Sequence, residues 1–322
     1  MKLNLTNMLF YYTMMMGTMI SISSNNWMMM WGGLEISLMS FIPLMSGGVM
    51  GSESSMKYFI VQSISSSMLV LAIMLTISMN MSYNYILMIS LIMKMGIAPF
   101  HNWVLSIVNS LNYNLMFILF TIMKIAPLVM LSYLNYLNNL FIVLSLIIGS
   151  CFSLNQNSIR KLLAYSSIYN MAYMLSVINM NYIWTMYLLT YSTILYMLIY
   201  MINKLKINYI NQFSINEFSI LIKSNLWMTM LSLGGMPPLM GFFPKLMIFQ
   251  ILIMKKMFIL LTMMILTSLM VMFFYMRMVF MSFINYSMLM KQNLKYLSNL
   301  TFLPLIMNTS LFPILISIKY LM

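Results

Sequence analysis

The chain has 322 residues, of which 62% are hydrophobic and only 6% are charged. This composition is typical of an integral membrane protein and excludes a separate soluble domain. A net charge of +13 comes from sparse basic residues, which do not form the continuous stripe that binds nucleic acid. A single cysteine, Cys151, excludes an internal disulfide and a thiolate-held zinc or iron–sulfur centre. We therefore expect this chain to bind no metal and no cofactor.

Methionine occurs 47 times. Methionine fills irregular apolar space well, which explains why it is tolerated but not why it is so frequent. We interpret the excess as codon usage of an AT-rich mitochondrial genome of arthropod type, in which an isoleucine codon is reassigned to methionine. The N-terminal residues are not typical of a cleavable basic presequence, and a protein made inside the mitochondrion needs none.

Runs of about 20 mainly apolar residues predict an all-α membrane protein with eleven spans in a single domain, residues 1–322. The predicted spans are residues 4–22, 26–46, 57–79, 85–108, 114–134, 138–154, 161–179, 183–203, 224–254, 257–283 and 300–320. The ninth is too long for one straight helix. It contains six helix breakers, Gly234, Gly235, Pro237, Pro238, Gly241 and Pro244. They predict two half-helices, unwound between about Leu233 and Pro244.

Milder interruptions are predicted at Ala98-Pro99 in the fourth span and at Ala126-Pro127 in the fifth. Broken backbone at membrane depth is tolerated only where it faces protein or a wet cavity. The breaks therefore predict where a polar site lies.

Basic residues in the loops predict the topology. An odd number of spans places the two ends on opposite sides of the membrane. Most basic residues fall on the N-terminal side: Lys2, Lys57, Arg160, Lys161, Lys204, Lys206, Lys223, Lys291 and Lys295, against Lys255, Lys256 and Lys319 opposite. The positive-inside rule then predicts an N-terminus on the inner side, the matrix for a mitochondrial protein. Glu53 and Glu217 fall in predicted loops and are expected in solvent.

Four charged residues lie near the middle of predicted spans: Glu35, Lys94, Lys124 and Lys245. A charge at the bilayer centre costs about 2.5–3.5 kcal/mol on insertion scales, so such residues face the protein interior and mark ion or proton pathways. Glu35 is the only acid at this depth, and we predict that it pairs with Lys94. Desolvation favours the neutral form of lysine but not of arginine, so buried lysines suit a proton relay. The alternative is that each charge only holds helices or broken-helix carbonyls together.

Two roles are open for His101: it shuttles protons, or it only fills a polar gap between helices. It follows Lys94 by seven residues, which would place both on one face of a slightly bent helix.

Two segments five spans apart share a pattern. Residues 94–103 and residues 237–245 each combine a Gly/Pro interruption with a buried lysine. An odd offset reverses the direction of a helix, which predicts inverted repeats over about residues 4–134 and 138–283, followed by a terminal helix at about 300–320. Interrupted segments in corresponding positions of two halves indicate a transporter's site.

Five motifs carry a resemblance to a known family. They are Trp31-Gly-Gly-Leu-Glu35, Lys94-Met-Gly-Ile-Ala-Pro-Phe-His-Asn-Trp103, Lys124-Ile-Ala-Pro127, Arg160-Lys-Leu-Leu-Ala-Tyr-Ser-Ser167 and Pro237-Pro-Leu-Met-Gly-Phe-Phe-Pro-Lys245. In this order they resemble subunit 2 of mitochondrial respiratory complex I, the proton-translocating NADH:ubiquinone reductase, within the antiporter-like membrane subunits.

The resemblance implies eleven spans, a matrix-side N-terminus and a C-terminus on the intermembrane side, in the mitochondrial inner membrane. It makes Glu35 the family's buried glutamate, Lys94 its paired lysine, Lys124 its central lysine and Lys245 its distal lysine, in one proton pathway. It also implies subunits 4L and 4 as neighbours, with accessory subunits and lipids around them. NADH, flavin, iron–sulfur clusters and ubiquinone would be used by other subunits, so no redox chemistry belongs to this chain.

Two alternatives stay open. A stand-alone cation/proton antiporter would need coordinating acids of its own, and only Glu35 lies at depth. The second alternative is a non-pumping assembly scaffold of the membrane arm. Burying lysines costs free energy, and a scaffold has no need of them.

Overall fold

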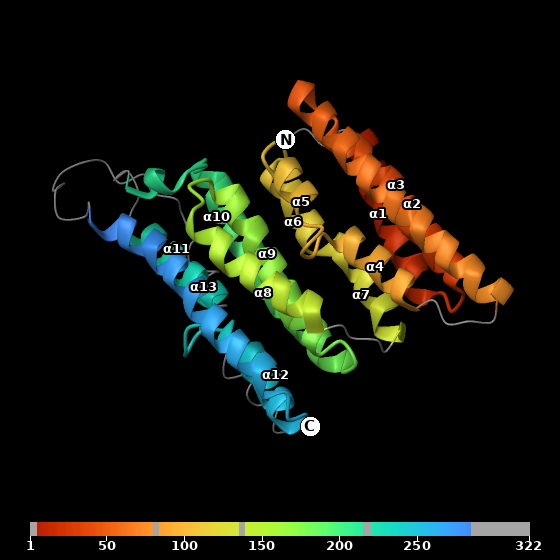
Figure 1. The fold of residues 1–322 in the computed structure, drawn as a ribbon. Helices are drawn as coiled ribbons and strands as arrows, with labels where there is room; N and C mark the ends of the chain where they lie inside the picture. The colour runs from red at the N-terminus through yellow and green to blue at the C-terminus, as the bar shows by residue number, and fades with distance from the viewer. Residues whose placement is uncertain (1–4, 80–83, 135–138, 215–219, 285–322) are drawn as a thin grey trace. The chain divides into compact units, whose positions relative to one another are not determined.

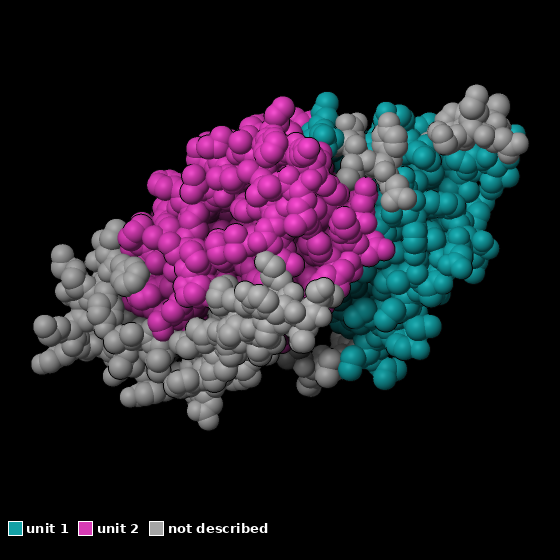
Figure 2. All heavy atoms as spheres, turned by 90° about the horizontal axis from the view of Figure 1, so that it is seen from below, with its two compact units in different colours: residues 1–141 teal, residues 142–322 magenta. Residues whose placement is uncertain are grey.

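The computed structural model describes residues 5–79, 84–134, 139–214 and 220–284. The described part is mostly helical and falls into two compact units, residues 1–141 and 142–322 (Figure 2). Within it, five helices are long and apolar enough to cross a membrane, and three shorter apolar helices accompany them. The chain is therefore a multi-pass helical membrane protein.

Unit 1 is a bundle of helices (Figure 1). Its elements are α1 (Leu5–Ser23), α2 (Trp27–Met45), α3 (Gly48–Met79), α4 (Asn84–Met95), α5 (Asn102–Val108), α6 (Tyr113–Phe120) and α7 (Ile122–Leu134). α1 packs against α2, α2 against α3, and α3 against α4. α7 contacts both α1 and α4. α3 contacts both α4 and α5, so it lies beside the break in the fourth span.

Small residues allow α1 and α2 to pack backbone against backbone. Gly17 and Ser21 on α1 face Gly33 and Ser37 on α2, each pair four residues apart. A Cβ on Gly33 would lie 2.6 Å from the carbonyl oxygen of Gly17. Such small-residue pairs are a common helix–helix contact in membranes. The contact holds the helix turn that carries Glu35.

We predict that Gly33→Ala destabilises unit 1. Its methyl group would meet backbone atoms of α1, which cannot rotate away, so the helices must separate; overpacking of this kind costs about 1–3 kcal/mol. Thermal unfolding of the detergent-solubilised complex should begin at lower temperature. Gly32→Ala is the matched control, because nothing lies within 4 Å of its added methyl. Equal stability of the two variants would contradict the prediction.

Unit 2 is built around one central helix. It contains all but the first three residues of α8 (Asn139–Leu154), and in addition α9 (Ile159–Ser176), α10 (Asn181–Leu205), η1 (Ile210–Ser214), α11 (Ile220–Gly234), α12 (Phe242–Met254) and α13 (Phe258–Ile284). Every residue of α9 from Leu162 to Ser176 is buried, and α10 and α12 both pack against it. The polar residues of α9 therefore face other helices on all sides.

Ten predicted spans coincide with described helices or helix pairs. The eleventh, residues 300–320, lies outside the described residues, and so does Glu217, which was predicted in a loop. One boundary was wrong: α3 begins at Gly48, well before residue 57. Glu53 is therefore helical and not in a loop, although it is exposed as expected. It pairs with Lys57 one turn later, an i,i+4 pair that favours a helix.

The fourth and ninth predicted spans are interrupted in the same way. A glycine in the left-handed region follows each first half-helix, Gly96 with φ +68° after α4 and Gly235 with φ +85° after α11. Three residues after each of these glycines is a proline that follows a cis peptide bond: Pro99 after Gly96, and Pro238 after Gly235. Gly235 lies 139 residues after Gly96, and the same 139 residues separate the two prolines. The two units thus contain one recurring broken-helix element.

The extent of the breaks differs from the prediction. The ninth span is discontinuous as predicted, but only over residues 235–241. At Ala98-Pro99 the helix stops completely over residues 96–101, so the expectation of a milder interruption was wrong. In the fifth span Pro127 lies inside α7, and the irregular residue is Thr121 between α6 and α7. A proline removes a single helical donor, and packed membrane helices tolerate that loss.

Candidate functional site

Lys94 lies in the last turn of the first half-helix of the fourth span. The helix closes with two hydrogen bonds, from the Gly96 amide to the Met93 carbonyl at 3.1 Å and from the Ile97 amide to the Ile92 carbonyl at 3.3 Å. This is the Schellman arrangement, which requires the positive φ of Gly96. It leaves the carbonyl of Lys94 without a helical donor. The last turn of a helix also favours a cation, so the local backbone suits this lysine.

Glu35 of α2 forms the predicted ion pair with Lys94. The Nζ of Lys94 lies 3.4 Å from the Oε1 of Glu35. The side chain of Lys94 is 3% exposed and that of Glu35 is 23% exposed. The pair is therefore asymmetric: the ammonium is enclosed by the helices of unit 1, whereas the carboxylate reaches the surface of the unit.

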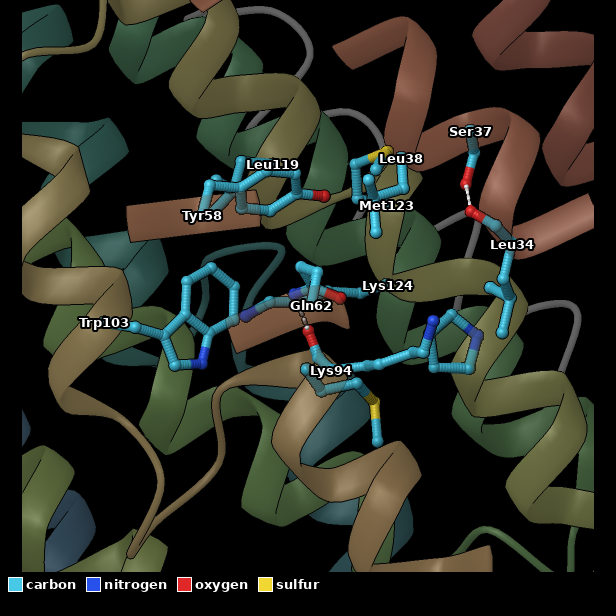
Figure 3. Close-up of a pocket in the computed structure, with 12 residues that line it drawn as sticks. Leu34, Ser37, Leu38, Tyr58, Gln62, Lys94, Trp103, Leu119, Met123 and Lys124 are labelled. Atoms are coloured by element: carbon cyan, nitrogen blue, oxygen red, sulfur yellow. Dashed lines mark hydrogen bonds between the residues drawn. The ribbon is translucent and has the colours of Figure 1, made fainter. Parts of the chain in front are cut away.

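A small cavity joins Lys94 to Lys124. Its volume is about 20 Å³, enough for one water, which needs roughly 10–15 Å³. Figure 3 shows its lining, with Lys94, Lys124 and Gln62 between Tyr58 and Trp103 on one side and Leu34 and Ser37 on the other. The lining contains the two lysines and no acid, while Glu35 contacts Lys94. Glu35 thus pairs with one of the two lysines that line this cavity.

Lys124 follows the irregular residue between α6 and α7. Its backbone amide donates to the carbonyl of Thr121 at 3.1 Å, which continues the helix through a tight turn. Its ammonium lies 5.6 Å from the centroid of the Phe120 ring, a cation–π distance. The residue is 4% exposed. Lys124 is therefore enclosed in unit 1 on the wall of the same cavity as Lys94.

Lys245 binds the broken end of α11. Its Nζ donates to the carbonyl of Gly234 at 2.7 Å and approaches the carbonyl of Leu233 at 3.5 Å. A Cβ on Gly235 would lie 2.8 Å from the same Nζ, so this glycine makes room for the ammonium. Lys245 itself lies in the first turn of α12, where the helix dipole disfavours a cation. The carbonyl end of α11 offsets that, because a helix C-terminus favours a cation.

Tyrosines extend the polar surroundings of Lys245 through unit 2. The hydroxyls of Tyr169 and Tyr173 are 2.8 Å apart, and Tyr173 donates to the carbonyl of Met264 at 3.1 Å. A hydroxyl has one proton, so Tyr169 must be the donor to Tyr173. Both rings lie under 6 Å from the Lys245 ammonium, at 5.7 and 5.8 Å. Tyr187 separately donates to Asn170 at 2.8 Å, an interhelical hydrogen bond.

A second cavity, of about 10 Å³, lies beside Lys245. Its polar lining comes from α9, α10 and α11: Asn170, Tyr187, Thr190, Tyr191 and Ser232. The hydroxyl of Tyr191 is buried and has no hydrogen-bond partner among the described residues. Each unit thus has a buried lysine next to a small polar cavity at its broken helix.

His101 does not join the buried lysines of unit 1. Its Nδ1 lies 3.1 Å from the carbonyl of Pro99, and the residue does not line the cavity of Lys94 and Lys124. The prediction that it shares a helix face with Lys94 was wrong. A seven-residue spacing places two residues on one face only in a continuous helix, and here the helix ends between them. Whether it shuttles protons stays a prediction.

Three residues that complete the site were not predicted from the sequence. Gln62 donates from α3 to the carbonyl of Lys94 at 3.1 Å, and Trp103 donates from α5 to the carbonyl of Met93 at 3.2 Å. Tyr58 lies one turn before Gln62 on the cavity wall. A glutamine inside an apolar span was the available signal, since an amide at that depth needs a partner.

Comparison with known proteins places the chain in a family. The family model described as NADH:quinone oxidoreductase/Mrp antiporter matches residues 24–84 and 74–271. NADH-ubiquinone oxidoreductase chain 2 of Anopheles gambiae is 40% identical over 257 residues, covering 75% of each chain. The protein of that name is 35% identical in Locusta migratoria and 34% identical in Mus musculus, again over 75% of each chain.

Solved structures agree on the fold. A chain of respiratory complex I from Thermus thermophilus superimposes with a TM-score of 0.81 at 20% identity, covering 98% of this chain and 78% of that one. A chain of an archaeal membrane-bound sulfane sulfur reductase gives 0.82 at 14% identity, covering 95% and 72%. The chain therefore shares its fold with these chains of two respiratory membrane complexes. With the sequence matches, these findings show that the chain belongs to the NADH-ubiquinone oxidoreductase chain 2 family of antiporter-like membrane subunits.

Proposed function

We propose that this chain is a proton-translocating subunit in the membrane arm of respiratory complex I, in the mitochondrial inner membrane. In that complex, electron transfer from NADH to ubiquinone drives proton pumping. The observation that carries the proposal is the Glu35–Lys94 ion pair beside a cavity that also holds Lys124. A buried ion pair next to a second titratable cation is a costly arrangement for structure alone.

The proposed relay has Lys124 as the site where a proton waits. The Glu35–Lys94 distance controls how strongly the carboxylate stabilises positive charge in the cavity, because the interaction falls with distance. When the pair is close, the carboxylate is occupied by Lys94, and the proton on Lys124 is released. When the pair opens, Lys124 can be protonated again. Lys245 would pass the proton on in unit 2, and a lateral row of polar groups and waters would join the three lysines.

The membrane topology is part of the same proposal. The chain would have eleven spans, an N-terminus on the matrix side and a C-terminus on the intermembrane side. Its two repeats, about residues 4–134 and 138–283, would be inverted with respect to each other. The broken-helix element that recurs after 139 residues supports the repeat, and its occurrence in spans five apart supports the inversion.

Partners and cofactors follow from the role in the complex. Subunits 4L and 4 would be the neighbours, with accessory subunits and lipids at the remaining surface. The carboxylate of Glu35, which reaches the surface of unit 1, supports a neighbouring subunit on that side. NADH, flavin, iron–sulfur clusters and ubiquinone would be bound elsewhere in the complex, so this chain would contribute proton movement but no redox chemistry.

Glu35→Gln is the test of this proposal. The amide keeps the size of the side chain but cannot hold a negative charge beside Lys94. We expect the complex to assemble and to oxidise NADH with artificial acceptors at the normal rate, whereas proton pumping per electron falls. Pumping would be measured in proteoliposomes that contain the whole complex. Full pumping by an assembled Glu35→Gln complex would favour a scaffold role, and proton exchange for sodium by this chain alone would favour an antiporter.

A further inference from the structure

Two carbonyl groups occupy the same position in the two broken helices. Lys94 precedes Gly96 by two residues, and Leu233 precedes Gly235 by two residues. The α11 end closes as the α4 end does, because the Met236 amide donates to the Leu231 carbonyl at 3.1 Å and the Gly235 amide to the Ser232 carbonyl at 3.1 Å. The carbonyls of Lys94 and Leu233 are therefore equivalent, and both lack a helical donor.

The two units satisfy these equivalent carbonyls with different chemistry. In unit 2 the ammonium of Lys245 lies 3.5 Å from the Leu233 carbonyl and donates to its neighbour Gly234 at 2.7 Å. In unit 1 the donor is the neutral amide of Gln62, at 3.1 Å from the Lys94 carbonyl. Gln62 is 4% exposed, so its amide has no access to bulk water. Unit 1 thus closes its broken helix without using a cation.

We propose that Gln62 is a positioning residue of the proton pathway: by donating a neutral N–H to the Lys94 carbonyl, it leaves the ammonium group of Lys94 available for Glu35. Without this donor, an unpaired buried carbonyl would attract the nearest ammonium, as the α11 end attracts Lys245. The same amide also fixes the backbone from which the Lys94 side chain extends. This inference rests on the proposed function.

The surroundings of Gln62 are well defined. The titratable groups that face its cavity are Tyr58 on its own helix, Lys94 from α4 and Lys124 from α7 (Figure 3). Glu35 of α2 contacts Lys94, and α5 contributes the indole of Trp103, which does not titrate. Either lysine could become the donor to a freed Lys94 carbonyl, and both are used in the proposed relay. Loss of the amide should therefore change proton transfer as well as packing.

The test compares two isosteric variants in the intact complex. Gln62→Met keeps the volume and removes the donor, and we expect coupled NADH:ubiquinone turnover to fall about tenfold, the effect of a 1.36 kcal/mol higher barrier. Gln62→Glu can donate to the carbonyl when protonated but only accepts when ionised. Its coupled turnover should therefore exceed that of Gln62→Met at acid pH and fall to that level or below at alkaline pH. Ser66→Ala is the control, because Ser66 is buried on the same helix and bonds only to the backbone of that helix.

The outcomes separate this inference from the proposed function. Turnover of Gln62→Met within twofold of the unaltered complex, or identical pH profiles for Gln62→Glu and Gln62→Met, would overturn the positioning role. If Gln62→Met does not assemble, the pH profile of Gln62→Glu is compared with that of the unaltered complex. A profile identical to that of the unaltered complex would then overturn the positioning role. Lys124→Met is measured in parallel. If Lys124→Met loses pumping while Gln62→Met pumps normally, the proposed function stands and only the role of Gln62 is rejected.

Discussion

Lys124→Met should reduce coupled NADH:ubiquinone turnover and proton pumping by about a hundredfold, because a positioned proton-transfer group contributes roughly 10²–10⁴-fold. Methionine keeps most of the volume of the lysine side chain and removes its titratable group. The contact with the Phe120 ring and the wall of the cavity would be retained as apolar packing. We therefore expect assembly and NADH oxidation with artificial acceptors to stay normal. The measurements are coupled NADH:ubiquinone turnover and the initial rate of proton pumping in proteoliposomes.

Lys124→Arg is the informative control for this prediction. An arginine keeps the positive charge but cannot release its proton near neutral pH. A relay predicts that both variants lose pumping, whereas a structural cation predicts that the arginine variant keeps it. Unchanged turnover and pumping in an assembled Lys124→Met complex would remove Lys124 from the pathway and favour the scaffold role.

The helices and the central ion pair could be predicted because one-dimensional patterns determine them. Long apolar runs fix where helices cross the membrane, and glycines with prolines fix where the ninth span breaks. Glu35 is the only acid in a predicted span, so an ion pair with a nearby lysine followed from the sequence. The start of α3 was missed because its Gly- and Ser-rich first turns resemble a loop, while the Glu53–Lys57 pair stabilises them as helix.

The remaining features depend on tertiary structure. The hydrogen bond from Gln62 to Lys94 joins residues 32 positions apart and requires α3 to lie against the broken end of α4. The position of His101 depends on how the chain turns after Gly96, where helical periodicity no longer applies. The clustering of Tyr169, Tyr173 and Tyr187 depends on which neighbours surround α9. A single sequence contains the residues for these contacts but not their distances.

Lys245→Met is expected to impair both pumping and stability, unlike Lys124→Met. The ammonium of Lys245 is the donor to the Gly234 carbonyl at the end of α11, and it also lies near the Leu233 carbonyl. A buried hydrogen bond to a charged group contributes about 1.5–3 kcal/mol, and an orphaned buried carbonyl adds a desolvation cost. We expect less assembled complex at a given temperature and an earlier thermal transition of the purified complex.

Lys245→Gln separates the two roles of this lysine. Its neutral amide can donate toward the α11 carbonyls, as the amide of Gln62 does at the equivalent carbonyl in unit 1, but it cannot carry a proton through the membrane. The glutamine side chain is shorter by one bond, so stability should be restored in part. Pumping should stay as low as in Lys245→Met. If Lys245→Gln pumped normally, Lys245 would be a helix-capping cation only, and the proposed pathway would have to leave unit 2 by another group. If both variants were as stable as the unaltered complex, the carbonyl contacts of Lys245 would contribute nothing to the fold, and the break after α11 would be held by packing alone.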